Sequence, residues 1–308
     1  MKSAIVTGAT GFVGSWLIEK LLHTGIQVTA LAIEEGTDVK GSIKDYIEGS
    51  IETIYHKPGE ISSVAGFIKS ADVFYNLGWG GVAPEHKNNL DIQMANIRFA
   101  VEAVQLAANI GCKRFIGIGS AAEYVYSKEL IESSQPPTPS DLYGAAKVSA
   151  RFMSQQLSNL LGLRFNWVIL PSTFGPRRND DNIITYTIRS LLDEKRPSYT
   201  KCEQMWDFLY IKDVVNALYL IGEKGIPGKT YGVGSGVYRP LYEYIEIIRD
   251  MINPCLPLGI GDRPYPQGIV PGSCIDIFDL VMDTGYKPEV SFEKGIGETI
   301  RYFKGQFK

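Results

Sequence analysis

The chain has 308 residues, of which 44% are hydrophobic and 21% are charged, a balance that is ordinary for a soluble globular protein. Its net charge of −3 gives no reason to expect a nucleic acid or an anionic membrane as a partner. No apolar run approaches the roughly 20 residues of a membrane-spanning helix, and Met1 and Lys2 lead straight into an apolar strand, so we expect no signal peptide.

Cysteine and histidine usage argues against a disulfide framework or a metal centre. The four cysteines are scattered, and the three histidines lack the spacing of metal ligands. These residues are Cys112, Cys202, Cys255 and Cys274, with His23, His56 and His86. We therefore expect reduced thiols, a cytoplasmic location and no bound metal.

The first 170 residues alternate short apolar strands with amphipathic helices. In chain order, the pattern predicts strands at 3–7, 27–33, 72–76, 114–118 and 165–170, and helices at 15–23, 89–110 and 143–161. Such alternation is typical of an α/β fold, a Rossmann-type parallel sheet doubly wound by helices through right-handed crossovers.

After Pro171 the loops carry Pro, Gly and Arg, and shorter helices are expected at 241–251 and 292–303. We therefore predict a dinucleotide-binding Rossmann domain over 1–170 and a smaller α+β substrate lobe over 171–308. The chain is expected to return partly to the first domain around 206–222. The lobe would close over the carboxyl ends of the strands, where open α/β sheets bind ligands.

A glycine-rich turn joins the first strand to the first helix. Gly8, Gly11 and Gly14 are spaced three apart. Glycine is needed where the backbone turns sharply, approaches a phosphate or lets helix and strand touch, and the helix start offers free N–H groups and a positive dipole end. The position of these glycines predicts a dinucleotide pyrophosphate site.

The end of the second strand bears on the choice between NAD(H) and NADP(H). A carboxylate there binds the ribose hydroxyls of NAD, whereas an arginine pairs with the extra phosphate of NADP. Glu34 and Glu35 follow this strand and no arginine does, but both acids come late and a solvated loop pair explains them equally well. Both cofactors stay open, with a slight preference for NAD.

A candidate proton-transfer set consists of Ser120, Tyr143 and Lys147. Tyr143 and Lys147 are four residues apart and so share one helix face. A nearby ammonium favours the phenolate, and a serine at a strand end can hydrogen-bond the same substrate oxygen. The same spacing recurs at Tyr124 and Lys128, but there it falls in the loop after the strand.

These residues together resemble the extended short-chain dehydrogenase/reductase family, in its nucleotide-sugar branch. The similar segments are 7–14, 76–79, Asn96, 143–147 and 285–295. The resemblance implies a nucleotide-sugar substrate, catalytic roles for Ser120, Tyr143 and Lys147, and a homodimer formed through a helix bundle. It implies cofactor contacts from Gly8, Thr10, Gly11, Phe12, Val13, Gly14, Glu34, Leu77, Gly78, Asn96, Tyr143, Lys147 and Pro171. It implies substrate contacts from Trp79, Ala121, Ala122, Thr173, Arg177, Asn182, Trp206 and Arg263.

Departures from the family narrow the reaction. Sugar 4,6-dehydratases carry an Asp-Glu pair where this chain has Ala121 and Ala122, and Glu123, on a continuing strand, would face the other way. Decarboxylating relatives need the same acid, and 3,5-epimerase/reductases need a cysteine near Ala121. Reduction of a C4 ketone and 4-epimerisation remain, and the motifs look most like reductases of CDP- or dTDP-linked 4-keto-6-deoxy sugars. A cofactor sensor without catalysis is a third reading of the same fold.

A further departure concerns the substrate pyrophosphate. Trp206 occupies a position where relatives commonly have an arginine that binds this group. The missing charge would have to come from Arg177, Arg178, Lys201 or Arg263, or the phosphates would be held by backbone amides. Solvated surface cations explain these four residues equally well.

Overall fold

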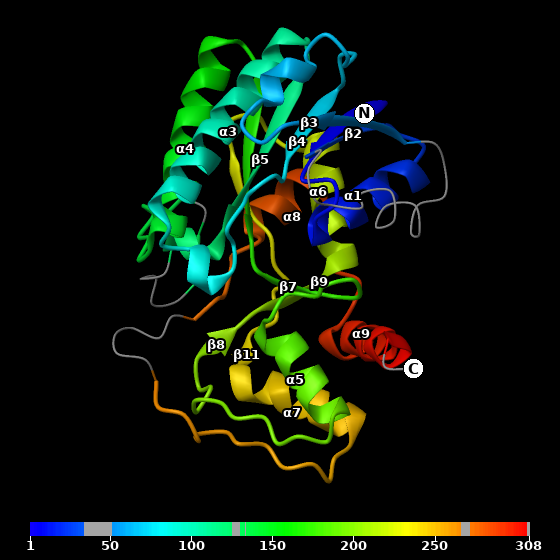
Figure 1. The fold of residues 1–308 in the computed structure, drawn as a ribbon, viewed down its shortest axis with the longest axis vertical. Coiled ribbons are helices and arrows are strands. Elements are labelled where there is room, and N and C mark those ends of the chain that lie inside the picture. The colour runs from blue at the N-terminus through cyan, green and yellow to red at the C-terminus, as the bar shows by residue number, and fades with distance from the viewer. Residues whose placement is uncertain (34–50, 125–129, 133, 266–271, 307–308) are drawn as a thin grey trace.

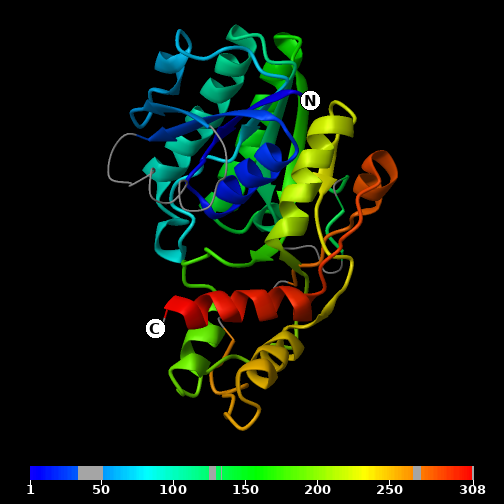
Figure 2. The same ribbon diagram turned by 90° about the vertical axis from the view of Figure 1, so that its right-hand side faces the viewer.

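The structure, a computed structural model, describes residues 1–33, 51–124, 130–132, 134–265 and 272–306. The upper part of the molecule in Figure 1 is a parallel sheet with helices on both faces, and the lower part is a smaller group of short strands and helices. In the orthogonal view of Figure 2, the C-terminal helix crosses the molecule below the sheet.

Seven strands form the sheet in the order β10-β6-β5-β4-β1-β2-β3, and all of their pairings are parallel. They are β1 (Ser3–Thr7), β2 (Gln27–Ile33), β3 (Glu52–His56), β4 (Val73–Asn76), β5 (Arg114–Ser120), β6 (Arg164–Leu170) and β10 (Thr230–Gly232). The strand order reverses beside β1, and open α/β sheets bind ligands outside the carboxyl ends of the strands at such a point. The predicted doubly wound α/β fold is confirmed.

Helices cover both faces of this sheet (Figure 1). One face carries α3 (Leu90–Asn109) and α4 (Leu142–Leu160), and the other carries α1 (Phe12–His23) and α6 (Ile211–Lys224), with α8 (Phe278–Thr284) against α6. Each face has its own hydrophobic core, because alternate residues of the strands point to opposite sides. Burial of these two cores fixes the strand register and so fixes which residues end each strand.

Aromatic stacking and two glycines shape the middle of the sheet on the α3 and α4 face. The rings of Phe74, Phe115 and Phe165 stack at centroid distances of 5.5 and 6.2 Å. The Trp167 indole lies over Gly117 and Gly119 of β5, where an added Cβ would lie well inside 3.0 Å of its ring. Glycines on β5 therefore make room for Trp167 directly beneath the end of the strand.

The lower part contains two two-stranded ribbons and three helices. They are β7 (Ser172–Phe174) with β9 (Phe208–Tyr210), β8 (Met205–Trp206) with β11 (Arg239–Pro240), α5 (Ile183–Leu192), α7 (Leu241–Ile252) and α9 (Phe292–Gln306). The chain returns from here to the sheet through α6, which overlaps the expected return at 206–222, and later through β10 and α8. The division into domains at residue 170 stays a prediction.

Candidate active site

The glycine turn sits where the helix α1 meets the sheet. Gly8 has a positive φ of 63°, and a Cβ there would lie 2.8 Å from the backbone nitrogen of Gly78. A Cβ on Gly14 would lie well inside 3.0 Å of the Gly8 carbonyl oxygen. Gly11, in extended conformation, precedes the first turn of α1 and offers no capping side chain, so the N–H groups of that turn are available to an anion. The turn has the form that a pyrophosphate requires, and α1 begins at Phe12, earlier than the expected Ser15.

The loop after β4 is held against this turn by a buried threonine. The Thr7 hydroxyl donates to the side-chain oxygen of Asn76 over 2.8 Å and accepts the backbone N–H of Gly78 over 3.0 Å. A Cβ on Gly78 would lie 2.8 Å from the Phe99 ring. Leu77 and Gly78 therefore border the glycine turn, as expected of cofactor-contacting residues, while Glu34 lies outside the residues that the structure describes.

The end of β5 and the start of α4 bring Ser120 and Tyr143 together. Asp141 caps α4 by accepting the N–H of Gly144 over 2.7 Å. A Cβ on Gly144 would lie well inside 3.0 Å of the Ala122 carbonyl oxygen, so the helix start packs tightly on the residues after Ser120. The Ser120 side chain lies close enough to the Tyr143 hydroxyl to lower the pKa of the phenol. One turn along α4, Lys147 is buried and its Nζ donates to the Ile118 carbonyl over 2.8 Å.

Burial is the largest cause of the pKa shifts of Tyr143 and Lys147. Burial raises the pKa of Tyr143 above its ordinary value, and the Ser120 side chain opposes this rise only in part. Burial lowers the pKa of Lys147 to about 7, and the charge of Glu123 opposes that change. The net shift of the Tyr143 pKa is therefore upward, opposite to the expected lowering, because desolvation of the phenol is the largest effect. Tyr143 is held neutral, which is the state a general acid needs.

Trp79 covers the buried Lys147. Its ring centroid lies 3.7 Å from the Lys147 Nζ, and its edge meets the Tyr143 ring at 6.2 Å with an interplanar angle of 89°. The Trp79 Nε1 donates over 3.2 Å to the Oε1 of Gln93, a buried residue of α3. The predicted substrate residue Trp79 thus lies at the site and contacts its proton-transfer groups.

Gln93 and Asn96 fix the loop that carries Trp79. Asn96 binds Gly80 twice, accepting its N–H over 2.8 Å and donating to its carbonyl over 2.9 Å, and the Gln93 amide donates to the Gly81 carbonyl over 3.4 Å. Asn96 therefore supports the site through the backbone of the loop. Gln93 was not predicted, although a polar residue three positions before Asn96 on the inward face of an otherwise apolar helix was a readable signal.

Glu123 does not lie on a strand as the sequence suggested. β5 ends at Ser120, and a short 3₁₀ helix (Ala121–Tyr124) follows because the chain turns under the start of α4. The Glu123 carboxylate is fully buried and accepts the Ser120 backbone N–H over 2.9 Å and the Trp167 Nε1 over 3.1 Å. It therefore points into the protein beneath the site, and the partly exposed residues next to Ser120 are Ala121 and Ala122.

Three predicted substrate residues make other contacts. Arg177 pairs with Glu19 on α1, and its guanidinium lies 3.7 Å from the centroid of the Trp16 ring. The Asn182 side chain caps α5, accepting the N–H groups of Ile184 and Thr185. The Thr173 hydroxyl donates to the carbonyl of Pro171, the residue between β6 and β7, over 3.2 Å. The structure brings neither Arg177 nor Asn182 into contact with Ser120, Tyr143 or Lys147.

The remaining two lie in the lower part of the molecule. Trp206 is paired across the ribbon with Arg239, and its ring contacts Phe208 at 6.2 Å. Among the described residues, none accepts a hydrogen bond from its buried Nε1. Arg263 is exposed, with its guanidinium 6.0 Å from the Tyr186 ring. Their expected role with the substrate stays a prediction.

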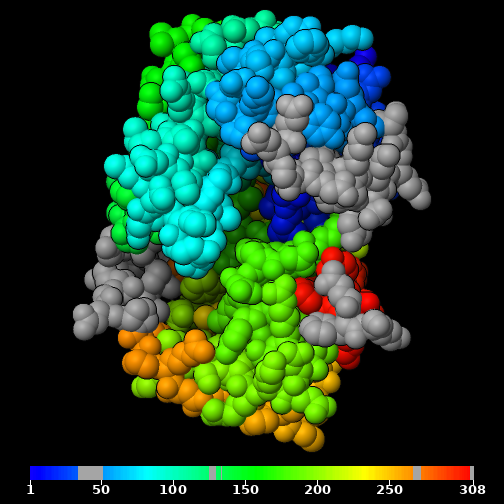
Figure 3. All heavy atoms as spheres, viewed as in Figure 1, coloured from blue at the N-terminus to red at the C-terminus, as the bar shows by residue number. Residues whose placement is uncertain are grey.

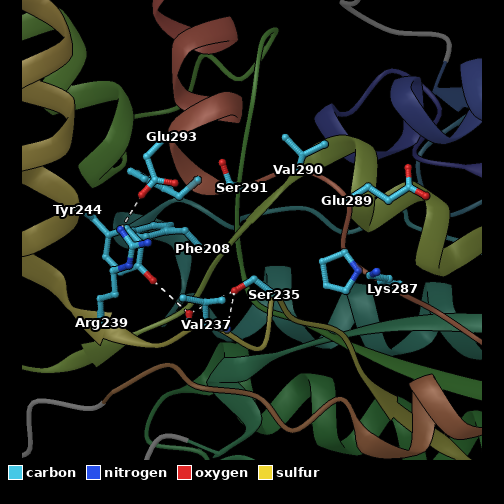
Figure 4. A pocket seen from close by; sticks show the side chains of 12 residues that line it. Phe208, Ser235, Val237, Arg239, Tyr244, Lys287, Glu289, Val290, Ser291 and Glu293 are labelled. Atoms are coloured by element: carbon cyan, nitrogen blue, oxygen red, sulfur yellow. Dashed lines mark hydrogen bonds and ion pairs between the residues drawn. The ribbon is translucent and has the colours of Figure 1, made fainter.

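The surface is hollowed where these elements meet. Figure 3 shows a hollow between the cyan residues around α3, the dark blue N-terminal segment and the green segment after β6. Two further cavities, of about 340 and 450 Å³, are lined by none of the three catalytic candidates. Figure 4 shows the first, in which Arg239 bonds Glu293 at 2.7 Å beside Phe208 and Tyr244.

Across the described ranges, no helix is long and apolar enough to cross a membrane. Within the same ranges, no group of three or more His, Cys, Asp or Glu side chains is arranged to hold a metal ion.

Known proteins resemble this chain along most of its length. The profile of the NAD dependent epimerase/dehydratase family matches residues 4–234. The dTDP-glucose 4,6-dehydratase of Shigella flexneri is 27% identical over 54% of this chain, which spans 48% of that relative's length. The CDP-abequose synthase of Salmonella typhimurium is 24% identical and is covered over 97% of its length by 96% of this chain.

The structure of UDP-glucose 4-epimerase with UDP-glucose from Thermotoga maritima superposes with a TM-score of 0.86 at 19% identity, over 99% of this chain and 100% of that one. This likeness concerns the fold, while the sequence profile concerns the family, whose cofactor is NAD. The match to the family profile covers three quarters of the chain and includes the glycine turn, Ser120, Tyr143 and Lys147. The chain therefore belongs to the NAD dependent epimerase/dehydratase family of nucleotide-sugar enzymes.

Proposed function

We propose that this protein reduces the C4 ketone of a nucleoside-diphosphate-4-keto-6-deoxyhexose. The observation that carries the proposal is the pairing of an intact Ser120, Tyr143 and Lys147 set with Ala121 and Ala122 at the two positions beside it. Alanine has no proton to exchange, and Glu123 is buried beneath the site. The site thus supports proton transfer at one oxygen and lacks an acid for removing water.

The glycine turn fits a nicotinamide dinucleotide, because Gly8 and Gly14 let the turn pack tightly on the loop after β4 and on α1, and the uncapped N–H groups at the start of α1 are available to phosphates. When bound in reduced form, the cofactor supplies a hydride to C4. The neutral Tyr143 hydroxyl donates its proton to the ketone oxygen, and the Ser120 hydroxyl orients that oxygen. The Lys147 ammonium, held between the Ile118 carbonyl and the Trp79 ring, stabilises the phenolate that Tyr143 becomes.

The matched relatives support this substrate class in different degrees. The CDP-abequose synthase, covered over nearly its whole length, supports a nucleotide-linked deoxysugar. The family's cofactor supports NAD over NADP, in agreement with the slight preference drawn from Glu34 and Glu35. Action in the cytoplasm, expected from the scattered cysteines, is part of the proposal.

A 4-epimerase is the second candidate. The same three residues serve oxidation and re-reduction of one carbon, and the fold superposes closely on a UDP-glucose 4-epimerase. An epimerase keeps NAD bound through its cycle, whereas a reductase exchanges it each turn. Finding NAD in the denatured protein, with interconversion of 4-epimers and no net loss of reduced cofactor, would favour this candidate.

The test supplies NADH or NADPH with CDP- or dTDP-4-keto-6-deoxyglucose and follows the absorbance of the reduced nicotinamide. Loss of one reduced cofactor per sugar is the expected result, and it identifies the base and the cofactor. With a plain nucleoside-diphosphate hexose and NAD, we expect no 4-keto-6-deoxy product, because Ala121 and Ala122 replace the dehydrating acids. Such a product, detected by mass spectrometry, would rule out this reading of the two alanines.

We also propose a homodimer formed through α3 and α4. These adjacent helices expose six large apolar side chains, which burial against a second copy would remove from water. They are Leu90 (59% exposed), Met94 (57%), Leu142 (39%), Phe152 (46%), Met153 (53%) and Leu160 (83%). Sedimentation equilibrium should give twice the chain mass, and Met94→Asp with Met153→Asp should give the single chain. A wild-type protein that sediments as a monomer at micromolar concentration would refute the proposal.

A further inference from the structure

A buried carboxylate lies directly beneath the proposed proton-transfer set. Glu123 is 0% exposed, and its Oε1 accepts both the Ser120 backbone N–H and the Trp167 indole N–H. No described residue lies within hydrogen-bond distance of its Oε2, and the nearest cation is the Arg151 guanidinium at 3.9 Å. A neutral glutamine could make both Oε1 bonds, so these bonds alone do not explain why the chain buries a charge here.

Three polar residues of α4 lie on the side of the helix that is near the Glu123 carboxylate. Tyr143, Lys147 and Arg151 are spaced four apart and so line one side of the helix. Burial raises the pKa of Glu123, and its hydrogen bonds and the charges of Arg151 and Lys147 oppose that rise. Glu123 acts in turn on Tyr143 and Lys147, and Arg151 also donates to the Tyr124 hydroxyl over 2.6 Å. The carboxylate is thus placed between a structural cation and the catalytic one.

The other charged groups around the set are weaker neighbours. Asp141 caps the start of α4 and acts on Tyr143 in the same direction as Glu123. The Lys87 Nζ lies 5.3 Å from the centroid of the Tyr143 ring, on the outer side. The neutral contacts of Lys147 are the Ile118 carbonyl and the Trp79 ring. Glu123 is the acid whose charge opposes the effect of burial on the pKa of Lys147.

We propose that Glu123 is a positioning residue of the active site: its buried negative charge keeps the Lys147 ammonium charged, and its hydrogen bond holds Ser120 in place. Burying an ammonium in an apolar pocket favours its loss of a proton, and a fixed negative charge nearby resists that loss. This inference deepens the proposed function, because Lys147 stabilises the Tyr143 phenolate only while it carries its charge.

The sign of the effect is the same for both titrating groups. A negative charge raises the pKa of Tyr143 and of Lys147 alike, so removing it must lower both. Whichever group controls the high-pH limit of activity, Glu123→Gln should move that limit to lower pH. With an effective dielectric constant of about 20 between these buried groups, the expected shift is at least about one pH unit.

The experiment measures the ionisation of Lys147 itself in the NAD complex and needs no sugar substrate. The side-chain NMR signals of ¹³C-lysine-labelled protein are titrated with pH, and the Lys147 signal is assigned by its absence in Lys147→Arg. Glu123→Gln should lower the Lys147 midpoint by about one unit. Glu123→Asp, which keeps the charge but is too short to reach both donors, should leave it near the original value. Failure of the reductase assay would leave this titration readable, so the two proposals fail separately.

Asp213→Asn is the matched control, because Asp213 is also buried and accepts two backbone N–H groups but lies on α6. It should not move the midpoint. An unchanged midpoint in Glu123→Gln overturns the proposal, and so does an equal shift in Glu123→Asp or in Asp213→Asn. If Glu123→Gln does not fold, Arg151→Gln removes the facing positive charge and must raise the midpoint; no rise would overturn the proposal.

Discussion

Replacing Tyr143 with phenylalanine is expected to lower turnover by about 100- to 10,000-fold, the usual size of a general-acid contribution. The phenol is the group placed to give a proton to the substrate oxygen, and burial keeps it protonated. The ring would remain, with its edge contact to Trp79, so the packing at the start of α4 should survive. NAD binding, measured by quenching of protein fluorescence, should change little.

Tyr219→Phe is the control for this change. It removes a hydroxyl from a half-buried tyrosine of α6 whose ring faces Lys20, away from β5 and α4. Turnover should stay at the wild-type level. Near-wild-type turnover in Tyr143→Phe would instead exclude Tyr143 from proton transfer, whether the reaction is reduction or 4-epimerisation.

The sheet was predictable where strands are buried and was missed at its edges. Five expected strands correspond to β1, β2, β4, β5 and β6, whose apolar runs are covered by helices on both faces. The unpredicted β3 and β10 are the two outer strands. β3 reads Glu-Thr-Ile-Tyr-His, with a mixture of polar and apolar residues, and β10 is three residues long. Neither carries the apolar run by which a buried strand is found.

For the candidate site too, some features were predictable from the sequence and others were not. The predictable features are local patterns, and the others are contacts between residues far apart in the chain. The Tyr143 and Lys147 spacing and the glycine turn are local patterns, and the structure places them as helix geometry requires. The partners of Arg177 lie on α1, 158 residues away in the sequence, and Trp167 reaches Glu123 across 44 residues. No spacing rule contains such pairs, so the ion pair of Arg177 and the burial of Glu123 went unforeseen.

Gly14→Ala is expected to weaken NAD binding about 100-fold, which corresponds to about 3 kcal/mol. The added methyl would lie well inside 3.0 Å of the Gly8 carbonyl oxygen, a backbone atom that cannot rotate away. Either α1 must move off the turn or the turn must open, and both changes disturb the N–H groups that would hold the pyrophosphate. The same collision should cost about 1–3 kcal/mol of unfolding free energy, as overpacking usually does.

The substitution at Gly14 isolates the steric collision from the conformational effects of replacing a glycine. It lies within α1, where alanine by itself favours the helix by about 1 kcal/mol, so any loss measures the close approach alone. Gly8→Ala adds the strain of a positive φ and should be worse. Gly66→Ala is the control, since no described atom lies within 4 Å of its added Cβ. Titration with NADH and thermal unfolding measure both quantities. A turn that only reverses the chain could accept a small shift of α1 without any effect on cofactor binding. Unchanged NADH affinity in Gly14→Ala would therefore mean that the cofactor is held elsewhere.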